Sequence, residues 1–167
     1  SKQLNLVTKY LKVKNLFLLN LKDNQLDQEP LLKIIKNLET IIKKIKPEII
    51  YTHSDKDLNI DHQITSKATV TASRLFQNKY IKKILFFEIL SSTEQSSSFG
   101  NYFSPNYFID ITNTIKDKIK LCTFYKNEFK KTPFPRSYES VKTLAKYRGN
   151  FVGKRYAEAF EVFRILK

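Results

Sequence analysis

The alternation of apolar and polar residues divides the first half of the chain into helices and strands joined by short polar loops. Apolar residues recur at the spacing of one helix face from Leu31 to Ile45, between Pro30 and Pro47. Short continuous apolar runs are typical of strands buried on both faces of a sheet. The elements expected up to residue 90 are a helix over 2–12, a strand over 13–19, a helix over 30–45, a strand over 48–53, a helix over 61–76 that Asp61 caps, and a strand over 84–90.

The second half of the chain opens with a run of small residues, Ser91–Gly100, that has no regular periodicity. Such a run predicts a surface loop or a lid. The elements expected after it are an extended segment over 103–112, a helix capped by Thr112, a helix over 137–147 capped by Ser137, and a closing strand over 156–166. No interdomain linker separates these elements, so residues 1–167 are predicted to form a single domain.

The order of these elements predicts an α/β fold. A strand, a helix and a second strand imply a parallel pair with a right-handed crossover, here between 13–19 and 48–53. Open α/β sheets bind their ligands at the carboxyl ends of strands. The polar stretch Thr52–His62, which follows the strand over 48–53, is therefore the candidate site.

Composition narrows the class of protein. An apolar fraction of 41% and an aromatic fraction of 13% are typical of a folded globular chain and exclude a disordered one. The net charge of +14 is compatible with a polyanion partner. The lysines, however, are scattered along nearly every helical segment, and only five of the 30 basic residues are arginine. We therefore expect a solvated basic surface and no nucleic-acid partner.

The sequence also bears on the compartment. No apolar run approaches the ~20 residues that a membrane span needs, and the first residues show no signal-peptide pattern. Cys122 is the single cysteine, so the chain cannot form an internal disulfide. These features predict a cytoplasmic protein without a membrane span.

The stretch Thr52–His62 contains both histidines of the chain and three aspartates. Imidazole and carboxylate groups are zinc ligands, and a catalytic zinc site usually needs three of them and one open position. Because Asp61 and His62 are adjacent, we expect one ligand and one orienting group. His62 would bind the metal, while Asp57 or Asp61 would fix a neighbouring donor or the loop. The alternative is a loop histidine with a structural role.

Thr52-His53 followed by Asp57-Leu58-Asn59-Ile60-Asp61-His62 resembles the second motif of the LmbE-like (PIG-L) family of zinc-dependent N-deacetylases. Further segments resemble the family in its order, over nearly the whole chain; they include Lys46-Pro47-Glu48-Ile49-Ile50, Phe86-Phe87-Glu88-Ile89, Pro105 to Ile111, Pro135-Arg136-Ser137 and Tyr156 to Phe160. The resemblance implies a three-layer, Rossmann-like α/β fold, with a mostly parallel sheet and helices on both faces.

The resemblance also implies a reaction, the hydrolysis of the N-acetyl amide of an amino-sugar-containing substrate with release of acetate. By position, His62 resembles the zinc ligand, and Asn59 and Asp61 are candidate catalytic residues. Many relatives carry a histidine where Asn59 stands, and an amide can donate a hydrogen bond but cannot carry a proton. Arg136, Arg155 and Glu158 are candidate substrate-binding residues, with surface ion pairing as the alternative.

The family's first motif, His-Pro-Asp-Asp-Glu, contributes two zinc ligands and the base, and it occurs nowhere in this sequence. We therefore expect the N-terminal strand to be missing, zinc to bind weakly or not at all, and the 167-residue chain to be inactive. The alternatives are a non-catalytic LmbE-like binding module or a degenerate fragment and, less favoured, a basic nucleic-acid binder. A sheet edge exposed by the missing strand predicts association into a homo-oligomer.

Overall fold

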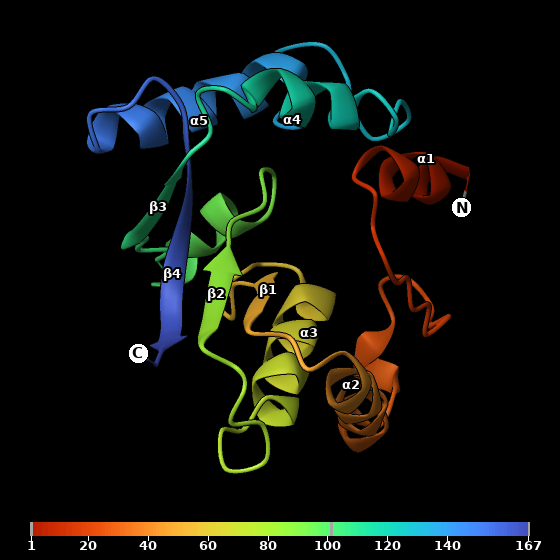
Figure 1. Ribbon diagram of the computed structural model, residues 1–167. Helices are drawn as coiled ribbons and strands as arrows, with labels where there is room; N and C mark the ends of the chain where they lie inside the picture. The colour runs from red at the N-terminus through yellow and green to blue at the C-terminus, as the bar shows by residue number, and fades with distance from the viewer. Residues whose placement is uncertain (1, 101, 167) are drawn as a thin grey trace. The chain divides into compact units, whose positions relative to one another are not determined.

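The computed structural model describes residues 2–100 and 102–166, which fold into two compact units (Figure 1). Unit 1 comprises the chain up to Leu18 and Phe108–Ala159, and unit 2 comprises Leu19–Tyr107 and the chain from Phe160 onward. Unit 1 contains α1 (Lys2–Tyr10), α4 (Ile115–Cys122) and α5 (Tyr138–Phe151), and unit 2 contains η1 (Leu26–Gln28), α2 (Leu31–Ile45), β1 (Ile49–His53), α3 (Ile60–Ala72), β2 (Lys83–Phe87) and η2 (Thr93–Phe99). The strands β3 (Tyr107–Asp110) and β4 (Ala157–Ile165) each have residues in both units.

The strands form one sheet in the order β1-β2-β4-β3. β1 runs parallel to β2, with Ile50 opposite Ile84, and β4 runs antiparallel to β2, with Val162 opposite Leu85. The predicted α/β class is confirmed. The sheet is mixed, because the closing strand enters it in the reverse direction.

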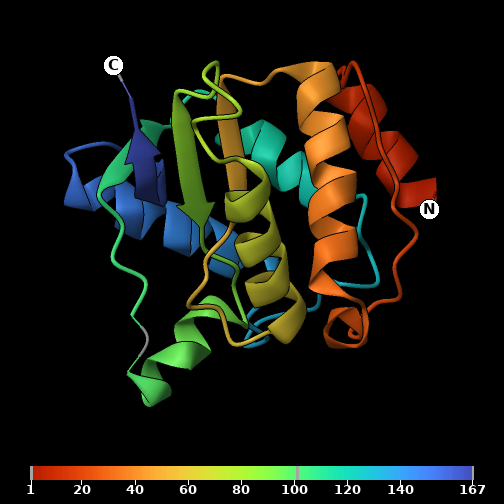
Figure 2. The same ribbon diagram turned by 90° about the horizontal axis from the view of Figure 1, so that it is seen from below.

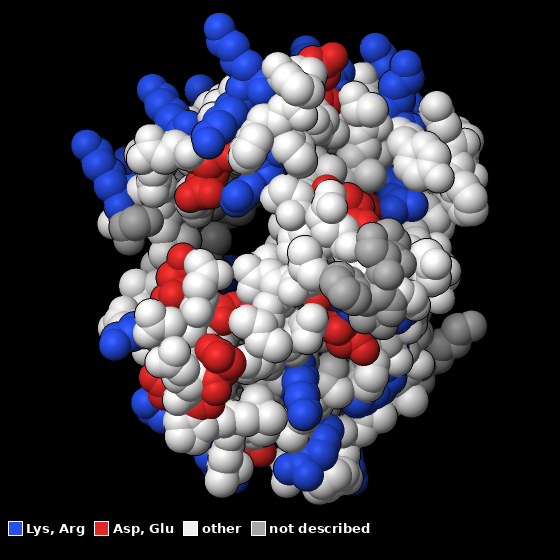
Figure 3. Space-filling model, turned by 180° about the vertical axis from the view of Figure 1, so that it is seen from behind, with Lys and Arg blue, Asp and Glu red and all other residues white. Residues whose placement is uncertain are grey.

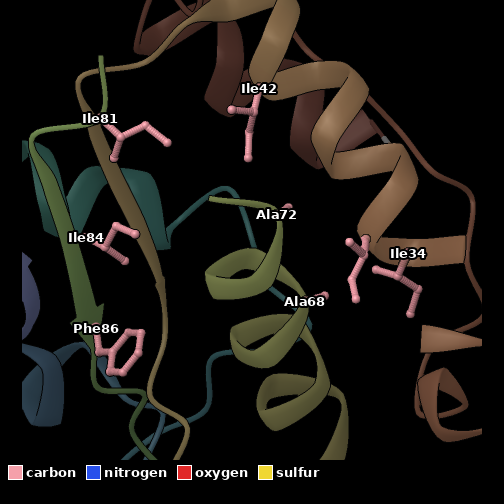
Figure 4. Packing of buried hydrophobic residues seen from close by; sticks show 8 residues of the cluster. Ile34, Ile42, Ala68, Ala72, Ile81, Ile84 and Phe86 are labelled. Carbon is pink, nitrogen blue, oxygen red and sulfur yellow. The ribbon is translucent and has the colours of Figure 1, made fainter. Parts of the chain in front are cut away.

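The core of unit 2 lies between its sheet and its helices. α3 packs on β1, and α2 packs on α3 (Figure 2). Figure 4 shows aliphatic side chains of α2 and β2 directed toward α3, whose fully buried members of the cluster are Ala68 and Ala72. The labelled members of this cluster are Ile34, Ile42, Ala68, Ala72, Ile81, Ile84 and Phe86. Alanine on α3 allows the helix to approach the sheet closely, which places the start of α3 beside the end of β1.

The strand predicted over 13–19 does not form, and Leu16, Phe17 and Leu18 are exposed. An apolar run becomes a strand only where another strand can pair with its backbone groups, and none of the described strands pairs with these residues. The predicted parallel pairing of 13–19 with 48–53 is therefore wrong. The parallel partner of β1 is β2, and α3 connects them.

Three local predictions are also corrected. Asn59, not Asp61, caps α3, because its Oδ1 accepts the Asp61 N–H at 2.8 Å. The segment Ser91–Gly100 is not without regular structure, since it contains η2. Thr112 does not cap α4, which begins after Thr114.

Unit 1 has a smaller core, made by Ile111, Ile115, Ala145 and Tyr156. Its longest helix, α5, is capped at its start by the Ser137 side chain, as predicted. Near its end, Gly149 lets the following backbone pass close to the helix. A Cβ atom at Gly149 would lie 2.6 Å from the Lys154 carbonyl oxygen. The glycine is therefore required by a close approach within unit 1.

Candidate functional site

The candidate site of unit 2 lies where β1 ends and the chain turns into α3. The loop after His53 is tied to the neighbouring strand, because the Ser54 N–H donates to the Phe87 carbonyl at 3.2 Å. Asn59 then starts α3 by capping its first turn. Since β1 and β2 are parallel, their carboxyl ends meet at this edge of the sheet. The loops that follow the two strands therefore lie close together.

Asp57 is the centre of this site, and its side chain is fully buried. Its Oδ1 accepts hydrogen bonds from the Asn59 N–H at 2.9 Å and from the Ser92 hydroxyl. Its Oδ2 accepts from the Thr93 hydroxyl at 2.6 Å. A buried carboxylate is stable only with such donors. Asp57 therefore joins the loop after β1 to the loop after β2.

These donors determine the charge of Asp57. Burial alone raises the pKa of the carboxyl group, because it disfavours the ionised form. The hydrogen bonds from Ser92, Thr93 and the Asn59 N–H, with the nearby His62, outweigh burial, so the pKa of Asp57 lies below its usual value of 3.8. Asp57 is therefore ionised at neutral pH and accepts hydrogen bonds with both oxygens.

The ionised Asp57 orients His62, whose Nδ1 lies 3.0 Å from Asp57 Oδ1. A carboxylate can only accept here, so the ring donates from Nδ1 and its second nitrogen, Nε2, is the atom left for another partner. The His62 ring also stacks on His53, with ring centroids 4.3 Å apart. The ring is thus held by a hydrogen bond and a stacking contact. This arrangement suits a metal ligand or a proton acceptor at Nε2.

His53, the other ring of this stack, is neutral over a wide pH range. Burial and the adjacent His62 lower the pKa of His53 from 6.5 to about 4. Its ring also lies against Phe87, at 4.8 Å between centroids. Its Nδ1 is buried and has no hydrogen-bond partner among the residues described. A small polar molecule beside His53 would satisfy this atom.

The two candidate catalytic residues of the loop have contacts within the protein. Asn59 uses its side-chain oxygen to cap α3. Asp61 accepts the Leu26 N–H through Oδ1 at 3.0 Å, which ties η1 to the first turn of α3. Both residues lie near His62 in sequence, but these hydrogen bonds position backbone segments. Their catalytic roles stay predictions.

The three candidate substrate-binding residues belong to unit 1, where each has a partner. Arg136 donates to Glu128 at 2.9 Å, and Glu158 accepts from Lys118. The Arg155 guanidinium lies over the Tyr156 ring, 5.7 Å from its centroid. Arg136 and Glu158 thus form local ion pairs, which was the alternative to substrate binding. A role in substrate binding stays a prediction for all three.

Ser92 and Thr93 were not among the predicted site residues. Both are buried, and Thr93 Oγ1 accepts the Ile89 N–H at 2.7 Å while it donates to Asp57. A signal was present in the sequence, since a Ser-Ser-Thr run follows the strand predicted over 84–90. Its meaning depended on the pairing of β1 with β2, which brings the two loops together.

The described residues do not fit a complete metal centre by themselves. Among residues 2–100 and 102–166, no three His, Cys, Asp or Glu side chains are grouped so that they could hold a metal ion. The Asp57 oxygens already accept from four groups of the protein. His62 Nε2 is the ligand atom that these bonds orient away from Asp57. The site therefore supplies part of a metal-binding set.

Comparison with known proteins connects this geometry to a family. The family model described as GlcNAc-PI de-N-acetylase, PIG-L, matches residues 1–73, which include the loop from Asp57 to His62. A search of curated proteins found no significant match. The predicted resemblance to the LmbE-like (PIG-L) family is confirmed by the matched segment.

Solved structures share the fold over almost the whole chain. The N,N'-diacetylchitobiose deacetylase from Pyrococcus horikoshii is 21% identical, with a TM-score of 0.75 over 98% of this chain and 62% of that one. A conserved protein from Thermus thermophilus is 19% identical, with a TM-score of 0.79 over 99% and 73%. The 4-carboxy-2-hydroxymuconate hydratase from Pseudomonas putida is 18% identical, with a TM-score of 0.69 over 99% and 72%. At such identities the likeness establishes the fold, and the chain spans less than two thirds of the first protein.

Proposed function

We propose that this chain takes part in the deacetylation of an amino-sugar nitrogen, because residues 1–73 match the LmbE-like (PIG-L) family. The substrate class is an N-acetylated sugar or glycoconjugate, and the products are acetate and a free amine. The names GlcNAc-PI de-N-acetylase and N,N'-diacetylchitobiose deacetylase support this choice. A cytoplasmic location and assembly into a homo-oligomer belong to the same proposal.

The observation that carries the proposal is the pair Asp57 and His62. Amide hydrolysis needs an activated water, donors for the oxyanion and a proton for the leaving amine. A buried, ionised Asp57 fixes the tautomer of His62 and leaves its Nε2 directed away from the carboxylate. This pair lies inside the segment that matches the family model.

Zinc is the metal we propose for the family reaction, and the described residues orient a single ligand atom for it. The 167-residue chain should therefore bind zinc weakly, through His62, and should not turn over substrate. Zinc titration by calorimetry measures this, with His62→Ala as the control that abolishes binding. Stoichiometric zinc that survives desalting, or turnover by this chain, contradicts the expectation.

The deacetylase function is tested on a catalytically active form of the protein, with zinc added. N,N'-diacetylchitobiose and GlcNAc-phosphatidylinositol are offered as substrates, and the released amine is measured. Asp57→Asn should lower kcat/KM by about 10–100-fold, as expected for a group that orients a metal ligand. Asp55→Asn is the matched control, because Asp55 is exposed in the same loop and should leave the rate unchanged. Equal rates for both variants would remove the basis of the proposal.

The second candidate is a non-catalytic binding module. Asn59 favours it, since this residue stands where many relatives carry a histidine and its oxygen is engaged in capping α3. The module predicts that GlcNAc-type ligands bind without acetate release, whether or not zinc is added. Binding by calorimetry together with an acetate assay separates the two candidates.

A further inference from the structure

A second buried carboxyl group of unit 2, that of Glu161 on β4, contacts the loop that contains the candidate site. Glu161 is only 8% exposed, and a carboxylate at this depth needs donors from the protein. It has two, because its Oε1 accepts a hydrogen bond from the Lys56 ammonium group at 2.8 Å and another from the Ser104 N–H. The donors stand 105 and 57 positions before Glu161 in the chain. Glu161 therefore joins two loops to β4.

Strand pairing places Glu161 at the edge of the sheet where β1 and β2 end. Glu161 stands opposite Phe86 of β2, and its neighbour Phe160 stands opposite Phe87. The Phe87 ring lies against His53, at 4.8 Å between centroids. Glu161 is thus one residue along β4 from the pair that packs against the histidine stack.

Lys56 directly precedes Asp57, and both its backbone and its side chain are held. Its N–H donates to the hydroxyl of the fully buried Ser54 at 3.2 Å, and its ammonium group donates to Glu161. On the face that Figure 3 draws, many Lys and Arg side chains extend outward into solvent, which is the usual position for such charges. Lys56 instead pairs with a buried acceptor. The backbone just before Asp57 is therefore fastened to β4.

We propose that Glu161 is a positioning residue for Asp57 and His62. By holding Lys56, it fixes the backbone from which the Asp57 side chain extends, so that Asp57 Oδ1 stays 3.0 Å from His62 Nδ1. Partners that hold the orienting group of a metal ligand act on the ligand in this way. The inference rests on the proposed function, in which Asp57 orients the ligand atom of His62.

Glu39 of α2 is the matched control, because it is a glutamate of the same burial with the same kind of partner. It is also 8% exposed, and it accepts a hydrogen bond from Lys36 at 3.0 Å. Its second partner, Arg74, is 3.8 Å away and follows the C-terminal end of α3, whereas His62 lies in the first turn of that helix. Loss of the charge on Glu39 should therefore lower stability without changing the contacts of His62.

NMR of the 167-residue chain tests the proposal at the His62 ring. The Nδ1 proton, which Asp57 accepts, should exchange slowly with water. Glu161→Gln keeps the size of the side chain but removes its charge, and it should raise this exchange rate about tenfold, the fold-change for a weakened hydrogen bond to a charged group. Lys56→Met should do the same. The double variant should exceed neither single variant, because both substitutions break one pair. Glu39→Gln should leave the rate unchanged.

Asp57→Asn separates this inference from the proposed function. If it leaves the exchange of the His62 proton unchanged, Asp57 does not orient the ring, and the proposed function loses its basis together with this inference. If Asp57→Asn speeds the exchange while Glu161→Gln and Lys56→Met do not, the positioning role of Glu161 is overturned and the proposed function stands. Equal acceleration by Glu39→Gln also overturns it, since Glu161 would then act only through overall stability. Lys56→Met decides the question if Glu161→Gln does not fold, because the Lys56 side chain is 38% exposed.

Discussion

The two units of the chain use their side chains in opposite ways. In unit 2, acidic and basic residues are nearly balanced, and its most important charge, Asp57, is buried and satisfied by donors from two loops. In unit 1 the charges are mostly unbalanced and exposed, and the buried core is smaller. The difference indicates that unit 2 contains an ordered polar site, whereas the distinctive feature of unit 1 is its positively charged surface.

The largest effect on stability is expected when a buried side chain is shortened in the core of each unit. Ile84 of β2 is fully buried in the larger cluster, so Ile84→Ala should lower the free energy of unfolding by about 2–5 kcal/mol. Ile115→Ala in unit 1 should lower it less, because Ile115 belongs to a small cluster and keeps 8% of its surface exposed. Urea unfolding followed by circular dichroism measures both. A larger loss for Ile115→Ala would reverse the contrast.

The next test concerns the buried charge of unit 2. Asp57→Asn should destabilise the protein by about 1.5–3 kcal/mol, the range for hydrogen bonds to a charged group. Asp55→Asn, on the exposed side of the same loop, should change the unfolding midpoint little. If the two variants unfold alike, the hydrogen bonds to Asp57 do not stabilise unit 2.

The pH dependence of this stabilisation follows from the lowered pKa of Asp57. Because the folded pKa is below the usual 3.8, folding favours the ionised form. The stabilisation is complete above about pH 5 and is lost as the pH falls through the folded pKa. Between pH 6 and pH 3, the free energy of unfolding should therefore fall more steeply with decreasing pH for the unchanged protein than for Asp57→Asn. Parallel pH curves would contradict this assignment.

A substitution at Gly149, where the helix and the following backbone lie close together in unit 1, should lower the free energy of unfolding somewhat less. Gly149→Ala places a Cβ atom 2.6 Å from the Lys154 carbonyl oxygen, so α5 or the following backbone must move. Such overpacking usually destabilises by about 1–3 kcal/mol. Thermal unfolding measures the loss. The difference between Thr143→Gly and Thr143→Ala, at an exposed position of the same helix, is the control for helix propensity alone. No loss for Gly149→Ala would show that this contact is loose.

The smallest effect is expected for a surface ion pair of unit 1. Lys154 and Asp110 lie 3.5 Å apart and are both solvent-exposed. Such pairs contribute about 0–1 kcal/mol, so Lys154→Gln should be within experimental error of the unchanged protein in urea. A clear loss of stability would indicate that exposed charges stabilise unit 1 as the buried charge of Asp57 stabilises unit 2, and the two units would then not differ in this respect.

The sequence predicted the parts of this structure that depend on local pattern. The amphipathic helix from Leu31 to Ile45, the polar loop around Asp57 and the orientation of His62 by an aspartate were all accessible. The candidate loop could be found because its chemistry is dense within one short stretch. The α/β class could be found because strands and helices alternate.

Other features depend on pairing between distant segments. The apolar run over 13–19 looks like a strand, but no described strand pairs with it. Ser92 and Thr93 became site residues only through the parallel pairing of β1 with β2. A sequence pattern specifies which side chains can make a bond and does not specify which segment will be adjacent.

The donors to Asp57 come from positions up to 36 residues away in the chain, so their bonds can form only after β2 has paired with β1. The network should therefore be completed late in folding and should open early, before the strands separate. The Asn59 amide proton reports on this opening, because it can exchange with deuterium only when Asp57 releases it. Native-state hydrogen exchange at this one amide would thus measure how often the site comes apart while the sheet beneath it stays intact.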